Sequence, residues 1–208
     1  MKKPSLLSLI AAFACVALYA QTPDYRFGKV SAEELRMTSY DKDPDAAAVY
    51  LYEENSLFYQ IDREIGLTSD YRARIKILKS DGTDQANVSI PYTDEYSVRE
   101  SVFGIDAVAY NLVDGKIVKT PLKKQYIFTE QVGENHKLVK FSIPEVREGT
   151  VIEYKFRKTS KNPTYIPSFR FQHDIPVARC HMQALIPEFF KFCLLYTSPS
   201  PRDPKTSR

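Results

Sequence analysis

Apolar and polar residues alternate along most of this chain, and the most regular stretch runs from position 138 to position 156. Residues 138–143 and 151–156 carry apolar side chains at every second position, so each would present one apolar face as an extended strand. Pro144 and the turn-forming residues 147–150 lie between them. We therefore expect the two segments to form an antiparallel strand pair around which the rest of the chain is organised.

The segment 71–78 shows the same period of two. Its odd-numbered positions are apolar, whereas Arg72, Arg74 and Lys76 occupy the positions between them. Antiparallel sheets commonly pack one face on the core and leave the other in water, so we expect the basic face of this strand to be wet. Further strands are expected at 49–52, 57–65, 86–91, 105–112, 116–122, 126–132, 169–175 and 178–186.

Two local motifs predict where elements begin and turn. Asp114-Gly115 joins the strands 105–112 and 116–122 and supplies the positive φ that a tight hairpin requires. Ser31 and Glu34 have the spacing of a capping box, which predicts a short helix at 31–35. Turn signals recur about every eight to fifteen residues, and no long helical period intervenes. The expected fold class is all-β, an antiparallel β-sandwich of roughly ten strands with one short N-terminal helix.

The N-terminal end has the composition of an export signal. Two lysines precede an apolar run from 6 to 18, and the small residue Ala20 closes the segment. Residues 1–20 are therefore expected to be a cleaved secretory signal peptide, with an uncleaved anchor or lipidation at Cys15 as alternatives. No later segment reaches the roughly 20 apolar residues that a membrane-spanning helix needs, so no transmembrane span is expected after cleavage. We expect an exported protein that is periplasmic, at the cell surface or extracellular.

Charge and cysteine content narrow the partners of the mature body. The whole chain has a net charge of +3, but its signal segment and its last residues are basic, which leaves about −1 for the body. This balance gives no electrostatic reason to expect a nucleic acid partner. Cys15 belongs to the signal and Cys193 to the C-terminal end, so Cys180 stands alone and no internal disulfide is expected.

Composition divides the chain into four stretches: a signal peptide at 1–20, a leader at 21–26, a β-sandwich domain at 27–192 and a tail at 193–208. The tail loses the alternation and is rich in proline, as a linker or a disordered segment would be. Residues 193–203 resemble the translated read-through of a sequencing adapter. We therefore expect a non-native tail, a domain truncated at its C-terminal end, and a natural protein that continues past Phe192.

Few residues suggest chemistry. Cys180 and His181, with Asp174 nearby, invite comparison with a thiol protease, but adjacent strand residues point to opposite faces and cannot form a dyad. His173 and His181 would lie ~26 Å apart along a straight strand, too far apart to share a metal ion. We expect Cys180 to be a buried or edge cysteine beside an exposed histidine.

Two other motifs are weak. Asp41, Asp43 and Asp45 repeat the first oxygen positions of a calcium-binding loop, but the required glycine and the final glutamate are missing. Asn87-Val88-Ser89 is a glycosylation sequon by pattern only, because it lies in a predicted strand. The sequence therefore predicts no catalytic, cofactor-binding or metal-binding residue and no cofactor.

A series of short motifs follows in order from residue 27 to residue 177. It includes Phe27-Gly28-Lys29-Val30-Ser31, Asp43-Pro44-Asp45-Ala46, Asp114-Gly115-Lys116, Phe141-Ser142-Ile143-Pro144, Gly149-Thr150-Val151-Ile152-Glu153-Tyr154 and Phe171-Gln172. In this ordered set the chain resembles the uncharacterised β-rich domain of unknown function that precedes transglutaminase-like domains in many exported proteins of Gram-negative bacteria.

The resemblance implies a non-catalytic accessory or binding module of an exported transglutaminase-like protein. A downstream transglutaminase-like domain would be its partner. The sequence leaves the ligand open between a glycan, a peptide and a neighbouring domain. The alternative is an N-terminal fragment of a transglutaminase-like peptidase or amidase whose Cys-His-Asp domain is missing from this chain. Under either interpretation this chain is expected not to be an enzyme, because the family's triad belongs to the downstream domain.

Overall fold

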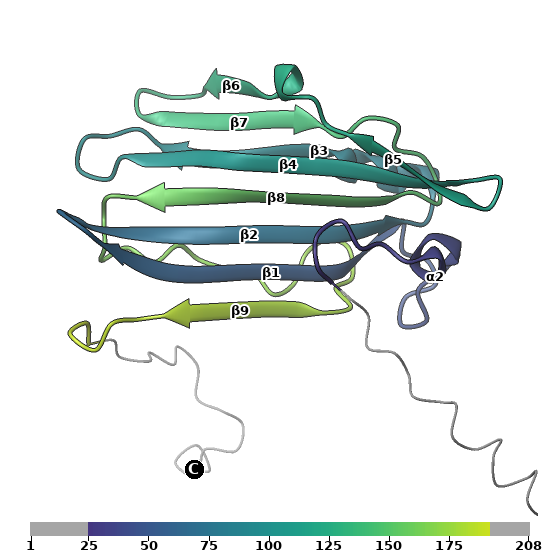
Figure 1. The fold of residues 1–208 in the computed structure, drawn as a ribbon, viewed down its shortest axis with the longest axis horizontal. Coiled ribbons are helices and arrows are strands. Elements are labelled where there is room, and N and C mark those ends of the chain that lie inside the picture. The colour runs from purple at the N-terminus through teal and green to yellow at the C-terminus, as the bar shows by residue number, and fades with distance from the viewer. Residues whose placement is uncertain (1–24, 192–208) are drawn as a thin grey trace, which may run out of the picture.

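The structure is a computed structural model that describes residues 25–191, where nine strands form two sheets (Figure 1). The elements of this part are α2 (Ala32–Arg36), β1 (Ala48–Ile61), β2 (Ile65–Ile77), the 3-10 helix η1 (Ser80–Ala86), β3 (Asn87–Thr93), β4 (Glu100–Val113), β5 (Lys116–Pro121), the 3-10 helix η2 (Lys124–Tyr126), β6 (Phe128–Gln131), β7 (His136–Ser142), β8 (Val151–Ser160) and β9 (Cys180–Leu185). One sheet has the order β5-β4-β8-β2-β1-β9 and the other β3-β7-β6. The predicted all-β class is confirmed.

The expected strand pair at 138–156 is wrong, because β7 and β8 lie in different sheets. β7 pairs with β3 and β6, whereas β8 pairs with β2 and β4. Their apolar faces meet across the sandwich instead, where the rings of Phe141 and Tyr154 pack edge to face with centroids 6.2 Å apart. Facing each other, the two strands bury both apolar faces at once, whereas side by side in one sheet they would need a further cover.

Three other strand predictions differ from the structure. The segment 57–65 is the end of β1, a polar turn at 62–64 and the start of β2, which pair antiparallel down to Ile61 opposite Ile65. Alternation alone does not distinguish such a tight hairpin from a continuous strand. The segment 169–175 forms no strand. β9 runs parallel to β1, so the sandwich is not wholly antiparallel. This direction is possible because the long connection 161–179 brings the chain back to the end of the sheet where β1 starts.

The two local motifs behave as predicted. The Ser31 hydroxyl accepts a hydrogen bond from the Glu34 amide at 3.1 Å, and the Glu34 carboxylate accepts one from the Ser31 amide at 2.6 Å, so the capping box begins α2. Asp114 and Gly115 have φ angles of 48° and 76° in the turn between β4 and β5. Both φ values are positive, as a primed hairpin turn requires.

The basic face of β2 is not wet as expected. We use outer face for the side of the six-stranded sheet that carries Arg72, Arg74 and Lys76, and inner face for the side that packs on the three-stranded sheet. On the outer face Arg74 and Lys76 are only 2% and 0% exposed. The N-terminal segment lies over them: Arg74 Nη1 donates to Glu34 at 2.7 Å, and Lys76 Nζ donates to the Leu35 carbonyl at 2.7 Å. Burial is tolerated because each charge has partners.

Candidate functional site

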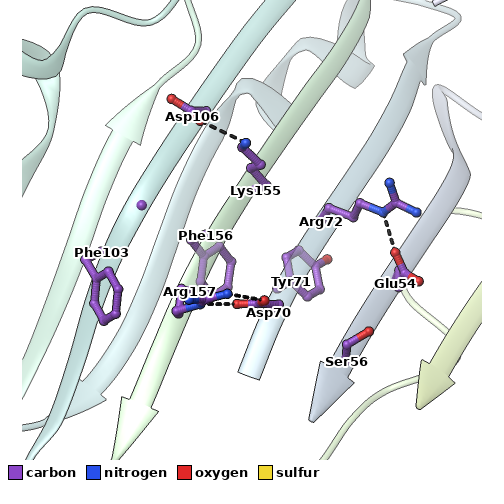
Figure 2. Close-up of a pocket in the computed structure, with 11 residues that line it drawn as sticks. Glu54, Ser56, Asp70, Tyr71, Arg72, Phe103, Asp106, Lys155, Phe156 and Arg157 are labelled. Carbon is purple, nitrogen blue, oxygen red and sulfur yellow. Dashed lines mark hydrogen bonds and ion pairs between the residues drawn. The ribbon is translucent and has the colours of Figure 1, made fainter. Parts of the chain in front are cut away.

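A groove of about 540 Å³ lies on the outer face of the six-stranded sheet, across β1, β2, β8 and β4 (Figure 2). On β2 the groove lies over Asp70 and Arg72, nearer the start of the strand than the buried Arg74 and Lys76. The groove is lined by charged side chains from all four strands and by Phe103 of β4. Its charged residues are Glu54, Asp70, Arg72, Asp106, Lys155 and Arg157.

Three ion pairs lie across the groove, each between residues that the sheet register places directly opposite one another. They are Glu54–Arg72, Asp70–Arg157 and Asp106–Lys155. The Asp70–Arg157 pair is bidentate: Nε and Nη2 donate to the two carboxylate oxygens at 2.5 and 2.6 Å. The hydrogen bonds and the charge of Asp70 raise the pKa of Arg157. Both side chains are about two-fifths exposed, so water screens the pair and it contributes little to stability.

Each cation of the groove also lies over an aromatic ring. The Arg72 guanidinium carbon is 4.9 Å from the centroid of the Tyr52 ring, and the Lys155 ammonium nitrogen is 4.8 Å from that of Phe27. The Arg157 guanidinium carbon is 5.8 Å from the centroid of the Phe58 ring. Every cation is thus held by a carboxylate and by a ring, which restricts its rotamers before any ligand arrives.

A β-bulge brings Phe103 and Asp106 to the same face of β4. Phe103 lies opposite Arg157 and Asp106 opposite Lys155, so two intervening residues of β4, 104 and 105, stand against the single residue 156 of β8. In a regular strand an odd separation would put positions 103 and 106 on opposite faces. Gly104, with a φ of 65°, allows the extra residue. Figure 2 shows the Phe103 ring and the Asp106 carboxylate along the same strand beside the groove.

Sequence reasoning missed the groove as a site. Its residues occupy positions that alternation assigns to wet faces, which is where charged residues are ordinary. The sequence does hold one signal of the groove: residues of opposite charge lie on strands that are neighbours in the sheet, such as Asp70 opposite Arg157. It could not be used without knowing that β2 pairs with β8.

The inner face carries a second cluster, which brings together two residues that the sequence singled out. Glu53 is almost fully buried there and accepts three hydrogen bonds: from the Tyr71 hydroxyl at 2.6 Å, from His173 Nε2 at 2.8 Å and from the Cys180 thiol at 3.6 Å. His181 contacts Glu54 on the other side of the sheet, with 3.3 Å between Nδ1 and the carboxylate. Cys180 and His181 therefore point to opposite faces, as the alternation predicts.

The environment of Cys180 does not activate its thiol. Burial, with a further contribution from the negative charge of Glu53, raises the pKa of Cys180 to about 11. The thiol is therefore protonated near neutral pH, and it serves as a donor to a carboxylate. Burial likewise raises the pKa of Tyr71. The cluster is suited to satisfying a buried carboxylate, because donors surround both of its oxygens.

A second hollow, of about 660 Å³, is lined by residues of β3, β4, β7 and β8 and of the connection after β8, including Tyr165. Its ion pair serves the fold: Lys158 lies 2.9 Å from Glu100 and donates to the Pro91 carbonyl at 3.0 Å, while Glu100 accepts from the Thr93 amide at 2.8 Å. These contacts tie β3 to β4 and β8. The outer-face groove is the better candidate, because the Asp70–Arg157 and Asp106–Lys155 pairs are side-chain pairs only. In its third pair, Arg72 also donates to the Tyr25 carbonyl at 3.1 Å.

The other sequence candidates lie apart from both clusters. Asp41 and Asp43 are exposed in the turn before β1, and Asn87 is exposed at the start of β3. Within residues 25–191 no group of three or more His, Cys, Asp or Glu side chains is arranged to hold a metal ion. In the same range no helix is long and apolar enough to cross a membrane. The predicted signal peptide at 1–20 and the tail at 193–208 lie outside the described residues.

The structure thus defines a two-sheet β-sandwich domain with a charged groove on its larger sheet. A sequence family described as a domain of unknown function with a solved structure, DUF3857, matches residues 66–207, which is more than half of the chain. The chain belongs to this family. The match extends over residues 193–203, and the foreign origin proposed for that segment stays a prediction.

Comparisons with individual proteins add little. No curated protein matches the sequence. Among solved structures, a protein of Parabacteroides distasonis described as a "putative protease" matches with a TM-score of 0.49 and 16% identity over 64% of this chain. This chain spans 28% of the length of that protein.

Proposed function

We propose that this chain is a non-catalytic accessory module of an exported transglutaminase-like protein, and that its outer-face groove binds a ligand for that protein. The observation that carries the proposal is the fixed array of the groove, in which each of three partly exposed cations is held by a carboxylate and a ring. An array whose rotamers are already restricted loses less side-chain entropy when a ligand binds.

The lack of catalysis is proposed from the state of Cys180. Its thiol donates to Glu53, and the nearby His173 is bonded to the same carboxylate instead of acting as a base on sulfur. A thiol with a raised pKa is a poor nucleophile near neutral pH. The transglutaminase-like partner and the export of the chain are proposed from the ordered motifs of residues 27–177 and from the signal-like composition of residues 1–20.

The test is a hydrolysis assay on the full chain. We expect casein and a library of fluorogenic peptide amides to be cleaved no faster than in buffer, and the Cys180→Ala variant to behave identically. Circular dichroism of both proteins, showing the same strand signal, is the control for folding. Turnover above buffer that Cys180→Ala abolishes would overturn the proposal and make this chain an enzyme.

A further inference from the structure

We infer that the groove binds an uncharged oligosaccharide, whose hydroxyl groups bond to the paired charges and whose apolar ring face packs on Phe103. The inference rests on the proposed function, because it names the ligand class of the same groove.

The charge of the groove argues against an ionic ligand. Its three acidic and three basic side chains are all paired with one another across neighbouring strands. An anionic ligand that approached Arg72, Lys155 or Arg157 would also approach the carboxylate paired with that cation, and the repulsion would offset the attraction. A neutral ligand does not need to break any pair.

The hydrogen-bonding capacity left in the groove fits hydroxyl groups. Arg157 uses Nε and Nη2 toward Asp70, so further N–H groups of its guanidinium stay available, as do lone pairs of the Asp70 carboxylate. The same holds for Asp106 and Lys155, whose side chains are 58% and 42% exposed. Donors and acceptors therefore alternate across the strands. A sugar hydroxyl donates and accepts at once, so it can bridge a carboxylate and a cation without separating them.

The position of the groove argues against a peptide that would add a strand. β2 lies between β1 and β8, and β8 lies between β2 and β4. The backbone groups of both strands are used by their neighbours, whereas strand addition requires a free sheet edge. A peptide here would be recognised through side chains alone, and the paired charges give it no ionic anchor.

Phe103 supplies the apolar part of the site. Its ring is 48% exposed beside charged residues, where the bulge at Gly104 holds it on the groove face. Single exposed rings are ordinary on protein surfaces, and Phe103 differs from one such as Phe128 because it lines the groove. Sugar rings have an apolar face bordered by hydroxyls, so one ring can cover Phe103 while its hydroxyls reach Asp106 and Arg157.

The experiment probes the labelled full chain on an array that carries neutral oligosaccharides of glucose, mannose, xylose, galactose and N-acetylglucosamine, acidic glycans, and twelve-residue peptides. The best neutral ligand is then titrated calorimetrically at low and high salt. We expect neutral oligosaccharides to be bound, with an affinity that salt does not change because no net charge is neutralised. Phe103→Ala and Asp106→Asn should each lower the affinity at least tenfold.

Two matched controls stand on the three-stranded sheet. Phe128→Ala removes a ring that is 61% exposed, and Glu130→Gln breaks the Lys140–Glu130 pair, whose exposure resembles that of Lys155–Asp106. Both should leave the affinity unchanged. Urea midpoints of all four variants show whether any loss of binding reflects unfolding.

Three results would overturn the inference: binding to no neutral oligosaccharide, binding to acidic glycans or peptides only, or neutral binding that Phe103→Ala and Asp106→Asn leave intact. Binding of peptides or acidic glycans through the groove would refute the ligand class and leave the accessory module standing. The hydrolysis assay tests separately whether the module is non-catalytic.

Discussion

The guanidinium of Arg74 lies 2.7 Å from the carboxylate of Glu153, and both side chains are almost fully buried beneath the N-terminal segment. Glu34 holds the other side of the guanidinium at 2.7 Å. The second oxygen of Glu153 accepts hydrogen bonds from the Tyr110 hydroxyl and from the Gly28 amide, both at 2.8 Å. The pair therefore joins β2, β4 and β8 to the segment that covers their outer face.

Breaking this buried pair should destabilise the fold strongly. Glu153→Gln leaves Arg74 without its main counterion, and we expect the free energy of unfolding in urea to fall by about 3 kcal/mol or more. Glu130→Gln breaks an exposed pair on the other sheet and should cost less than about 1 kcal/mol. Equal losses for the two variants would show that burial of the Arg74 pair has no energetic weight.

The Cys180 thiol should react slowly, with an unusual pH profile. In a chain carrying Cys15→Ser and Cys193→Ser, we expect the rate of alkylation to keep rising to a pH of about 11, because the pKa of Cys180 is raised to that value. In guanidinium chloride the same thiol should level off near its ordinary pKa of 9.0. A folded-state profile that already levels off at pH 9 would contradict the donor role of the thiol.

Lys76 should make stability depend on pH between 7 and 9.5. Burial lowers its pKa from 10.5 to about 8, so in this interval the unfolded chain binds more protons than the folded one, and stability rises with pH. The lysine should contribute a rise of about 2 kcal/mol over the interval. Urea titrations of the wild type and of Lys76→Met check this. The difference between their pH slopes isolates the lysine, and parallel slopes would refute the prediction.

Gly82 should not tolerate a side chain. A Cβ at this position would lie 2.3 Å from the carbonyl oxygen of Ala47, which also accepts hydrogen bonds from the Leu78 and Lys79 amides. We expect Gly82→Ala to lower the melting temperature and to cost about 1–3 kcal/mol through overpacking. Gly133→Ala, whose Cβ would meet its nearest atoms at 3.6 Å, is the matched control and should change stability by less than about 0.5 kcal/mol. Similar losses in both would indicate a general cost of replacing glycine.

The sequence by itself determined the local features of this protein. The alternation of apolar residues predicts the strands β2 and β8, the Ser31–Glu34 spacing predicts the start of α2, and Asp114-Gly115 predicts the hairpin turn. Each depends on interactions within a few residues of the chain, such as a capping hydrogen bond or the φ values open to glycine, so neighbouring residues suffice to predict it.

Only the tertiary structure decided what each strand lies against. Alternation with a period of two shows that a strand has an apolar face, but it does not show which sheet the strand joins. The sequence therefore predicts β7 and β8 as partners, although they face each other across the core. The cover over Arg74, the bulge that puts Phe103 beside Asp106, and the convergence of His173 and Cys180 on Glu53 all join residues far apart in the sequence or change the parity of a strand. Such contacts are selected by the burial of the whole core, which no short segment encodes alone.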